Sequence, residues 1–205
     1  VLGRAATGTG KTAAFSLPLL ERHVLGQEAD APLVLVLTPT RELCLQVSEA
    51  FHNYGRKAGV LVTPIYGGQD YSRQIRALRR GTHVVVATPG RALDHIGRGT
   101  LDLTNIKAVV LDEADEMLDM GFVDDIKQIL SAAPAEKRML MFSATMPEEI
   151  LAIAEQFMRP DYEIVRTKTE TVSTDLTEQI YYEVRRENKL EVLSRIIDME
   201  DDLYA

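Results

Sequence analysis

One short segment of the sequence combines residue types that suit chemistry on phosphate groups. It reads Ala5-Ala6-Thr7-Gly8-Thr9-Gly10-Lys11-Thr12 and matches G-x-x-x-x-G-K-[ST], except that Ala5 replaces the first glycine. Gly8 and Gly10 allow successive N–H groups to face inward around phosphates. Lys11 supplies a point charge for the β- and γ-phosphates, and the Thr12 hydroxyl is a ligand suited to Mg²⁺. We interpret 5–12 as a phosphate loop rather than a glycine-rich turn that only caps a helix.

A second segment places carboxylates directly after an apolar run. It reads Val109-Val110-Leu111-Asp112-Glu113-Ala114-Asp115. Ligands of open parallel sheets bind at the carboxyl ends of strands, so Asp112 is placed to hold Mg²⁺ through water. Glu113 would orient and polarise an attacking water, and phosphoryl transfer needs little beyond such positioning and charge neutralisation. The two segments together predict hydrolysis of a nucleoside triphosphate, with Lys11, Asp112 and Glu113 as the catalytic residues. For Asp115 alone, a helix-capping role is an alternative.

The elements that must position these residues alternate along the chain. Runs rich in Val, Leu and Ile, typical of strands buried on both faces, occupy 33–38, 60–66, 83–88, 107–113, 138–145 and 162–166. Amphipathic patterns between them predict helices over 11–26, 41–58, 69–80, 89–97, 122–133 and 147–158. This alternation predicts an α/β doubly wound domain, with a mostly parallel sheet and helices on both of its faces.

A change of pattern near residue 168 predicts a domain boundary. Residues 168–176 are polar without apolar periodicity, which is typical of a linker. An alternating strand over 177–185 and a helix after it follow, and such a pair is too small to bury a core of its own. We therefore predict a domain over 1–167, a linker over 168–176 and the start of a truncated second domain over 177–205. The chain is expected to be a fragment at both ends.

The composition narrows the class of protein. The net charge is −8, so a polyanion would have to bind at a local site built partly from backbone and neutral donors. The sequence contains no run of about 18 apolar residues, so it predicts no membrane span. The single cysteine, Cys44, excludes an internal disulfide and fits a reducing compartment such as the cytoplasm. The simplest expectation for Cys44 is a small buried residue in a helix.

Six short motifs in one order resemble the DEAD-box RNA helicases. The sequence Asp-Glu-Ala-Asp at 112–115 is the signature of that family. The phosphate loop is accompanied by Pro39-Thr40-Arg41-Glu42-Leu43, Gly67-Gly68, Thr88-Pro89-Gly90-Arg91 and Ser143-Ala144-Thr145. The resemblance covers 1–167 and the entry to a second domain, and is strongest toward the bacterial cold-shock and ribosome-assembly branch. It implies a RecA-like P-loop NTPase fold that binds ATP and Mg²⁺.

The resemblance also implies which residues meet each ligand. Nucleotide-binding residues would be Ala6, Thr7, Gly8, Thr9, Gly10, Lys11 and Thr12, with Thr12 and Asp112 toward the metal. RNA-binding residues would be Pro39, Thr40, Arg41, Gly67, Gly68, Thr88, Pro89, Gly90 and Arg91. N–H groups at helix starts, hydroxyls and arginines suit a phosphate backbone, so binding independent of base sequence is expected. For TPGR, a turn with Pro at the first helical position is an alternative.

Other residues near these motifs allow two interpretations. The resemblance implies that Asp115, Ser143 and Thr145 couple the ATP state to RNA, whereas Thr145 could also cap the helix that follows. Tyr66 and Tyr71 could stack on bases, although ordinary packing is the simpler expectation. The arginines of the helix 69–80 lie within a 120° sector and indicate either a basic stripe for RNA or, more commonly, a solvated face. They are Arg73, Arg76, Arg79 and Arg80.

The function implied is ATP hydrolysis coupled to RNA binding and local duplex unwinding. In the family, ATP lies between two RecA-like domains and RNA crosses both, so the fragment would hold half of each site. The implied partners are RNA, the missing second RecA-like domain, and ribosome-assembly or RNA-decay factors. Two alternatives stay open: an ATP-gated RNA clamp or assembly scaffold, and a nucleotide switch such as a GTPase. No N-K-x-D base-reading motif supports the latter.

Overall fold

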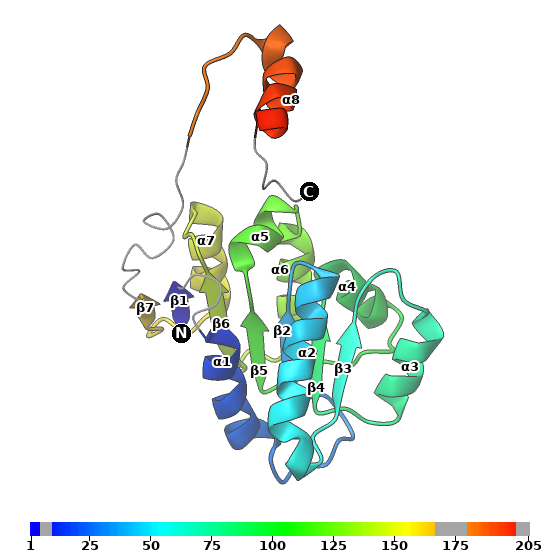
Figure 1. The fold of residues 1–205 in the computed structure, drawn as a ribbon. Coiled ribbons are helices and arrows are strands. Elements are labelled where there is room, and N and C mark those ends of the chain that lie inside the picture. The colour runs from blue at the N-terminus through cyan, green and yellow to red at the C-terminus, as the bar shows by residue number, and fades with distance from the viewer. Residues whose placement is uncertain (5–9, 167–179, 200–205) are drawn as a thin grey trace. The chain divides into compact units, whose positions relative to one another are not determined.

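The computed structural model describes residues 1–4, 10–166 and 180–199. The chain divides into two compact units, Val1–Lys168 and Thr169–Ala205. In the described residues of the first unit, all strand pairings are parallel and the strand order is β3-β4-β2-β5-β6-β1-β7 (Figure 1). The strands are β1 (Leu2–Arg4), β2 (Val34–Leu37), β3 (Val62–Ile65), β4 (Val84–Ala87), β5 (Ala108–Leu111), β6 (Arg138–Ser143) and β7 (Ile164–Arg166).

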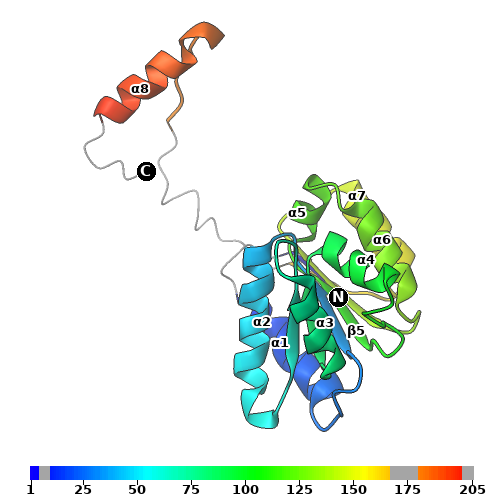
Figure 2. The same ribbon diagram turned by 90° about the vertical axis from the view of Figure 1, so that its right-hand side faces the viewer.

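Helices cover both faces of this sheet, as the alternation of the sequence predicts (Figure 2). One face carries α1 (Lys11–Leu19), the π-helical turn η1 (Leu20–Val24) and α2 (Arg41–Gly55), which continues as the 3₁₀ turn η2 (Arg56–Ala58). The other face carries α4 (Pro89–Gly97), α5 (Ala114–Asp119), α6 (Val123–Ala132) and α7 (Glu148–Phe157). The helix α3 (Tyr71–Arg79) packs beside the edge strand β3.

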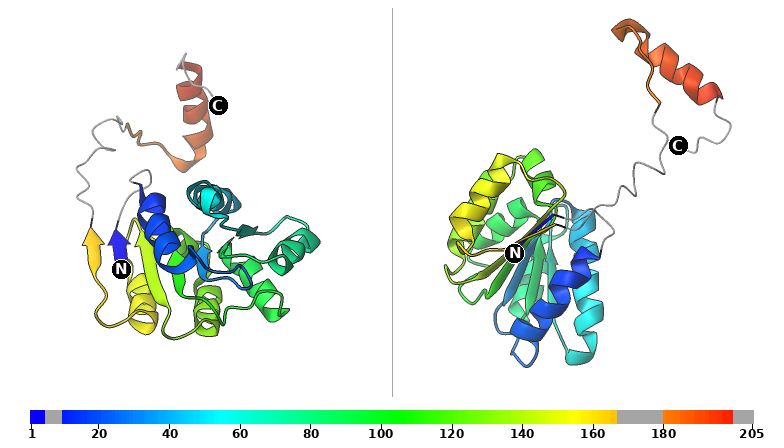
Figure 3. Two further views of the ribbon diagram at one scale, coloured as in Figure 1. Left: turned by 90° about the horizontal axis from the view of Figure 1, so that it is seen from below. Right: turned by 90° about the vertical axis from the view of Figure 1, so that its left-hand side faces the viewer.

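Alternate side chains of each central strand enter two separate cores. In β2, Val34 and Val36 contact the cluster of α1 and α2, whereas Leu35 and Leu37 contact the cluster of α4 to α7. All four are fully buried, which explains why the run shows no polar alternation. The doubly wound α/β fold predicted from the sequence is therefore confirmed, and Figure 3 shows the sheet between its two helical layers.

The single cysteine lies inside the first core. Cys44 is fully buried on α2, and its thiol donates a hydrogen bond to the Val86 carbonyl at 3.2 Å. Burial raises the pKa of the Cys44 thiol to about 12. The structure thus confirms the expectation of a packed, helical cysteine.

Two expected elements differ in the structure. The first predicted helix changes geometry after Leu19 and ends at Val24, because Pro18 lacks the N–H that an α-helix needs and a wider π turn follows. The predicted strand over 177–185 is wrong for residues 180–185, which form no regular element; 177–179 lie outside the described residues. A single strand cannot form its hydrogen bonds without a partner.

The second unit is described over 180–199. It contains the 3₁₀ turn η3 (Arg186–Asn188) and α8 (Lys189–Met199), where a helix is expected. None of the residues 180–199 is buried, and Leu190, Leu193 and Ile197 are exposed. The assignment of this unit to a second RecA-like domain stays a prediction. In the described parts of the chain, no helix is long and apolar enough to cross a membrane.

Candidate active site

The sequence motifs converge because the sheet is parallel. Each strand from β1 to β6 is followed by one of the motifs, and the carboxyl ends of parallel strands meet at one edge of a sheet. The segments after β1, β5 and β6 are neighbours there, since β5 pairs with β6 and β6 pairs with β1. The segments after β2, β4 and β3 continue the same edge. The fold thus separates a phosphate-directed half of this edge from a half that carries the GG and TPGR motifs.

The phosphate loop is described only at its end. Residues 5–9, and with them Ala6, Thr7, Gly8 and Thr9, lie outside the described residues. Gly10 takes a left-handed conformation with φ 83°, which favours glycine, and α1 begins at Lys11. The first N–H groups of an α-helix have no partner in the helix, so this end of α1 is suited to an anion.

Lys11 and Asp112 meet across the edge. The Lys11 Nζ lies 4.0 Å from the Asp112 Oδ1, and the two side chains are 9% and 3% exposed. The Asp112 Oδ1 is buried without a hydrogen-bond partner, because 4.0 Å is too long for one. A buried carboxylate oxygen without a partner is unfavourable in a resting fold and is what a cation site requires.

Burial sets the protonation behaviour of Asp112. Desolvation raises the pKa of this carboxyl to about 6, Lys11 opposes the rise, and the neighbouring Glu113 adds to it. The backbone N–H of Asp112 donates to the Leu37 carbonyl at 3.0 Å, so the residue still belongs to the strand edge. Any cation arriving here would favour the charged carboxylate.

Glu113 stands at the turn from β5 into α5. Its φ of 53° and ψ of 54° are left-handed, and no other non-glycine residue of the described ranges has a positive φ. This conformation is unfavourable for a residue with a Cβ atom. It turns the chain out of β5 and directly into α5, whose N-cap is Glu113.

Asp115 is fastened to the loop after β6. Its Oδ2 accepts hydrogen bonds from the Thr145 N–H at 2.8 Å and the Thr145 hydroxyl at 2.9 Å. Its own N–H donates to the Ser143 hydroxyl at 3.2 Å. Burial alone would raise the pKa of Asp115, but the hydrogen bonds from Thr145, Ser143 and the Asp115 backbone together outweigh it and lower that pKa. The acidic segment and the SAT segment are therefore one hydrogen-bonded unit.

The helix-capping alternatives for these residues are wrong. The residue at the N-cap of α5 is Glu113, and Asp115 lies inside the first turn. The helix α7 begins at Glu148 after Pro147, and no side chain caps it. Thr145 instead uses both of its donors on Asp115.

Arg4 is a residue that the motif search missed. Its Nε donates to the Ala144 carbonyl at 3.2 Å, which ties the end of β1 to the SAT segment. Nothing in the local sequence singles it out, because the contact joins residues 140 positions apart. The strand that leads into the phosphate loop is thus connected directly to the segment that holds Asp115.

The PTREL segment shapes the start of α2. Thr40 is the N-cap of this helix, and its hydroxyl accepts a hydrogen bond from the Leu43 N–H at 3.2 Å. Arg41 is exposed, and its guanidinium carbon lies 5.1 Å from the ring centroid of Tyr66. Pro39 is buried and sets the approach of the chain. The start of α2, with Arg41 as its first residue, therefore lies at the motif edge that follows β2.

The GG and TPGR segments flank the same stretch of the edge. Gly67 and Gly68 are exposed, and Gly68 has φ 78°. Pro89 is the first residue of α4, with Thr88 as its N-cap, so the predicted turn with Pro at the first helical position is present. Gly90 is exposed in the first turn of α4.

The tyrosines near these segments follow the simpler expectation of ordinary packing. Tyr66 is 5% exposed, and Tyr71 stacks on the His95 ring, so both are packing residues. The arginines of the predicted helix 69–80 are exposed, which a solvated face and a basic stripe for RNA both require, so each interpretation stays a prediction. In the described residues they form no ion pair; they are Arg73, Arg76, Arg79 and Arg80.

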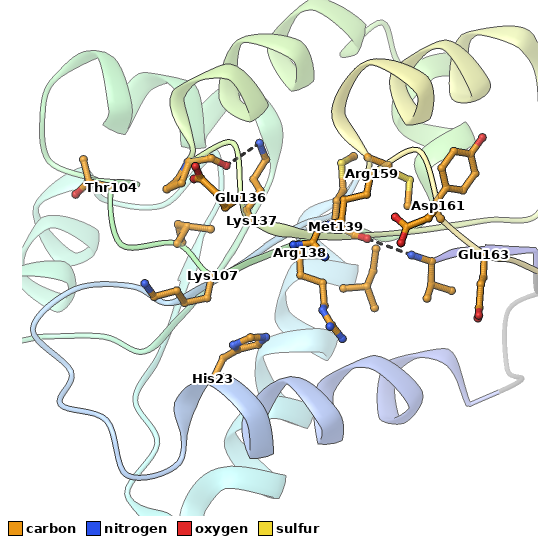
Figure 4. Close-up of a pocket in the computed structure, with 16 residues that line it drawn as sticks. His23, Thr104, Lys107, Glu136, Lys137, Arg138, Met139, Arg159, Asp161 and Glu163 are labelled. Carbon is orange, nitrogen blue, oxygen red and sulfur yellow. Dashed lines mark hydrogen bonds between the residues drawn. The ribbon is translucent and has the colours of Figure 1, made fainter.

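A hollow of about 770 Å³ lies elsewhere (Figure 4). Its walls include Lys107, Arg138, Arg159 and Glu163, which precede or begin the strands β5, β6 and β7. It therefore opens at the amino ends of the strands, opposite the motif edge. The small hollow of about 220 Å³ at the motif edge is lined by Lys11, Glu113, Asp115, Glu116, Asp119, Ala144 and Thr145. The candidate catalytic and coupling residues Lys11, Glu113, Asp115 and Thr145 therefore line this smaller hollow.

Comparison with known families agrees with the geometry of the edge. A model of the DEAD/DEAH box helicases matches residues 1–153. The chain belongs to the DEAD/DEAH box helicase family. The match runs from β1 into α7 and so includes every motif at the carboxyl edge. The resemblance inferred from the six motifs is confirmed.

Similar DEAD-box proteins are longer than this chain. It is 51% identical over 200 residues to the DEAD-box ATP-dependent RNA helicase CshA of Geobacillus kaustophilus, covering 98% of this chain and 42% of that protein. For CshA of Bacillus subtilis the identity is 50%, covering 100% and 41%. A DEAD box protein from Methanococcus jannaschii has a similar structure, with a TM-score of 0.78, 42% identity, and coverage of 99% and 53%. The chain thus spans about two fifths of the length of the curated relatives named here.

Proposed function

We propose that the parent protein is an ATP-dependent RNA helicase and that this chain supplies its first RecA-like, ATP-binding domain. The observation that carries the proposal is the joined unit at the carboxyl edge. Lys11 faces Asp112 at 4.0 Å, and Asp115, three residues on, holds the SAT segment through Thr145. Membership of the DEAD/DEAH box family and the likeness to proteins named RNA helicases support it.

The residues of the phosphate-directed half divide the work on ATP. Lys11 and the N-terminal N–H groups of α1 bind the phosphates, since both present positive charge to the edge. Glu113 orients the attacking water and accepts its proton. Catalysis of phosphoryl transfer is mostly positioning and charge stabilisation, which these groups can supply.

The donor set fits Mg²⁺. The buried Asp112 Oδ1 without a hydrogen-bond partner and the hydroxyl of Thr12, which follows Lys11 in the first turn of α1, are oxygen ligands, which hard cations prefer. When bound, Mg²⁺ would neutralise charge on the phosphates. The role of Asp112 in the protein is then to keep one buried carboxylate oxygen ready at the strand end.

Coupling to RNA would pass through Asp115. Because its carboxylate holds both donors of Thr145, movement of the acidic segment on nucleotide binding also moves the SAT segment. The second half of the edge, with Thr40, Arg41, Gly68 and Arg91, binds the RNA backbone without reading bases. That the full protein works in the cytoplasm and meets ribosome-assembly or RNA-decay factors stays a prediction.

The assignment of Glu113 can be tested in the full-length protein. Glu113→Gln keeps the size of the side chain and removes the base, so ATP turnover should fall at least about a hundredfold. Binding of a fluorescent ATP analogue should stay within about threefold. The matched control is Glu49→Gln, an exposed glutamate on α2, which should leave turnover unchanged. Unchanged turnover in Glu113→Gln would refute the role.

Duplex unwinding distinguishes the two candidate functions of the full-length protein, a helicase and an ATP-gated RNA clamp. Full-length protein with ATP should separate a short RNA duplex that carries a single-stranded tail, and strand release is read by fluorescence. In parallel, ATP-dependent retention of a single-stranded RNA is measured on the same sample. Retention without strand separation would overturn unwinding in favour of the ATP-gated clamp.

A further inference from the structure

A buried polar cluster lies beneath the GG and TPGR segments. Gln74 of α3 is 2% exposed, and His95 of α4 is fully buried. Neither residue belongs to a motif, and neither has a part in the proposed handling of ATP. Buried polar side chains are unfavourable unless their hydrogen bonds are made, so the partners of these two residues show what the cluster holds in place.

The amide of Gln74 uses both its donors and its acceptor. Its Nε2 donates to the Tyr66 carbonyl and to the Gln69 Oε1, each at 2.9 Å. Its Oε1 accepts a hydrogen bond from the Arg91 Nη1 at 3.1 Å and lies 2.9 Å from the His95 Nε2. A side-chain amide offers two donors and two acceptor positions, and all four are occupied. Gln74 therefore joins the residues on both sides of Gly67 and Gly68 to the TPGR arginine.

Arg91 is held on one side of its guanidinium. The Nη1 also donates to the Gln69 carbonyl at 3.2 Å, and the guanidinium carbon lies 5.1 Å from the ring centroid of Tyr71. Among the described residues, the hydrogen bonds of this side chain involve Nη1 alone. An arginine has five N–H donors, so Nη2 and Nε keep donors for a phosphate group while Nη1 fixes the orientation.

His95 fixes the orientation of the Gln74 amide. Its ring stacks on Tyr71 with centroids 4.2 Å apart and an interplanar angle of 6°. Because the Gln74 Oε1 only accepts, the His95 Nε2 carries the hydrogen, and the Thr100 hydroxyl donates to the Nδ1 at 2.8 Å. Burial and the nearby Arg91 lower the pKa of His95 to about 4, so the ring is neutral at neutral pH.

We propose that Gln74, supported by His95, is a positioning residue for RNA: it sets the place of Arg91 relative to the Gly67–Gly68 turn so that one RNA backbone meets both. The inference rests on the proposed function, because it needs RNA at this edge. It adds a residue that contacts neither RNA nor ATP. Because Gln74 acts through Arg91, replacing Gln74 should have no further effect on RNA binding in a protein that already lacks the Arg91 guanidinium.

The test uses the full-length protein and a fluorescein-labelled oligouridylate as the RNA. Gln74→Met keeps the volume and removes every hydrogen bond of the amide. The RNA concentration that gives half-maximal stimulation of ATP turnover should rise about tenfold, the effect expected when a charged hydrogen-bonding group is misplaced. The turnover number at saturating RNA and the affinity for a fluorescent ADP should stay within about twofold. Gln128→Met, at an exposed position of α6, is the matched control and should change nothing.

A double-mutant cycle separates positioning from general damage. If Gln74 acts through Arg91, Gln74→Met combined with Arg91→Ala should bind RNA as weakly as Arg91→Ala alone. Additive losses, or a parallel loss of ADP affinity, would overturn the proposal and make Gln74 a structural residue only. An unchanged RNA requirement in a folded Gln74→Met protein would overturn it as well.

A second variant keeps the proposal testable if the Gln74→Met protein does not fold. Gln74→Glu keeps the acceptor for Arg91 and loses both bonds to the GG side, so the RNA requirement should rise several-fold, and a wild-type value would overturn the proposal. The proposed function fails in a different way. If the wild-type protein shows no stimulation of ATP turnover by RNA, the helicase assignment falls before any variant is compared.

Discussion

Two carboxylates three residues apart respond to their surroundings in opposite directions. Asp112 has a raised pKa of about 6 because it is desolvated, whereas hydrogen bonds from Thr145 lower the pKa of Asp115. The folded state therefore holds a proton on Asp112 that the unfolded chain releases near pH 3.8. The contribution of Asp112 to the free energy of unfolding therefore falls as the pH rises from 3.8 to about 6. Asp115 contributes stability above pH 3.8 and loses it as the pH falls through its folded pKa.

Removing the Asp112 charge should stabilise the chain when no nucleotide or divalent cation is present. Asp112→Asn imitates the neutral carboxyl, so the free energy of unfolding at pH 7 should rise by about 1 to 3 kcal/mol. The gain should shrink toward pH 4, where Asp112 is protonated in the fold. Urea unfolding at both pH values measures it. Asp119→Asn, at an exposed position, should change stability by less than about 0.5 kcal/mol. A destabilised Asp112→Asn protein would contradict the raised pKa.

The hydroxyl of Thr145 should be visible in the titration of Asp115. Thr145→Val removes one of the two donors at the Asp115 Oδ2 and leaves the backbone N–H. The pKa of Asp115 should then rise, since hydrogen bonds to the charged form are what lower it. NMR titration of the carboxyl carbon measures the change. Thr145→Ser keeps the hydroxyl and should titrate like the wild type; equal pKa values in all three proteins would rule out the side-chain bond.

At the scale of elements, one glycine fixes how α3 leads into β4. Gly81 has φ 97°, and a Cβ added to it would lie 2.6 Å from the Ala29 carbonyl oxygen. The next residue, Thr82, donates its N–H to that same oxygen at 2.8 Å. The connection after α3 therefore lies against the connection that precedes β2, with no room for a side chain between them.

Gly81→Ala should unfold the domain at lower denaturant. Strain of the left-handed backbone and the clash with Ala29 together predict a loss of about 2 to 4 kcal/mol in the free energy of unfolding. Gly99→Ala separates the two causes, because Gly99 has φ 64° and nothing within 4 Å of the added Cβ. It should lose only about 1 kcal/mol. Equal losses in the two variants, measured by urea unfolding, would mean that the clash is relieved at no cost.

The sequence was most informative where local chemistry decides an element. The run of β2 is buried on both faces, and α4 spans Pro89–Gly97 as expected because Thr88 and Pro89 define its start. Tertiary contacts explain the differences. α5 is a separate six-residue helix that follows the strained turn at Glu113, and the strand expected near 180–185 is not formed there.

The candidate site divides in the same way. Lys11, Asp112 and Asp115 could be chosen from motifs, since each motif follows a strand. Gln74, His95 and Arg4 could not, because no motif contains them and their partners lie 5 to 140 residues away. Family resemblance implied that Asp115, Ser143 and Thr145 act together, whereas the hydrogen bonds between Asp115 and Thr145 required the strand order β5-β6.

At the scale of the whole chain, the two units differ in how they are stabilised. The first has two buried clusters, one on each face of its sheet. The described part of the second exposes Leu190 by 76% and Leu193 by 53% on α8. A short amphipathic helix without a buried face is marginal in water. We therefore expect the stability of the chain to reside in Val1–Lys168.

A chain that ends at Lys168 should be as stable as the full 205 residues. Because no residue of 180–199 is buried, deletion of Thr169–Ala205 should leave the urea midpoint and the slope of unfolding unchanged. The difference in free energy should be less than about 0.5 kcal/mol. A lower midpoint for the shorter chain would show that the second unit stabilises the first.

The buried thiol of Cys44 has a practical consequence for spectroscopy. It is the single cysteine of the sequence, fully buried, with a pKa of about 12, so a maleimide dye at neutral pH finds almost no thiolate there. A cysteine introduced at an exposed position such as Glu49 can be labelled selectively, with the native core left intact. Fluorescence energy transfer could then follow the distance between this domain and any labelled partner, without first replacing a native cysteine.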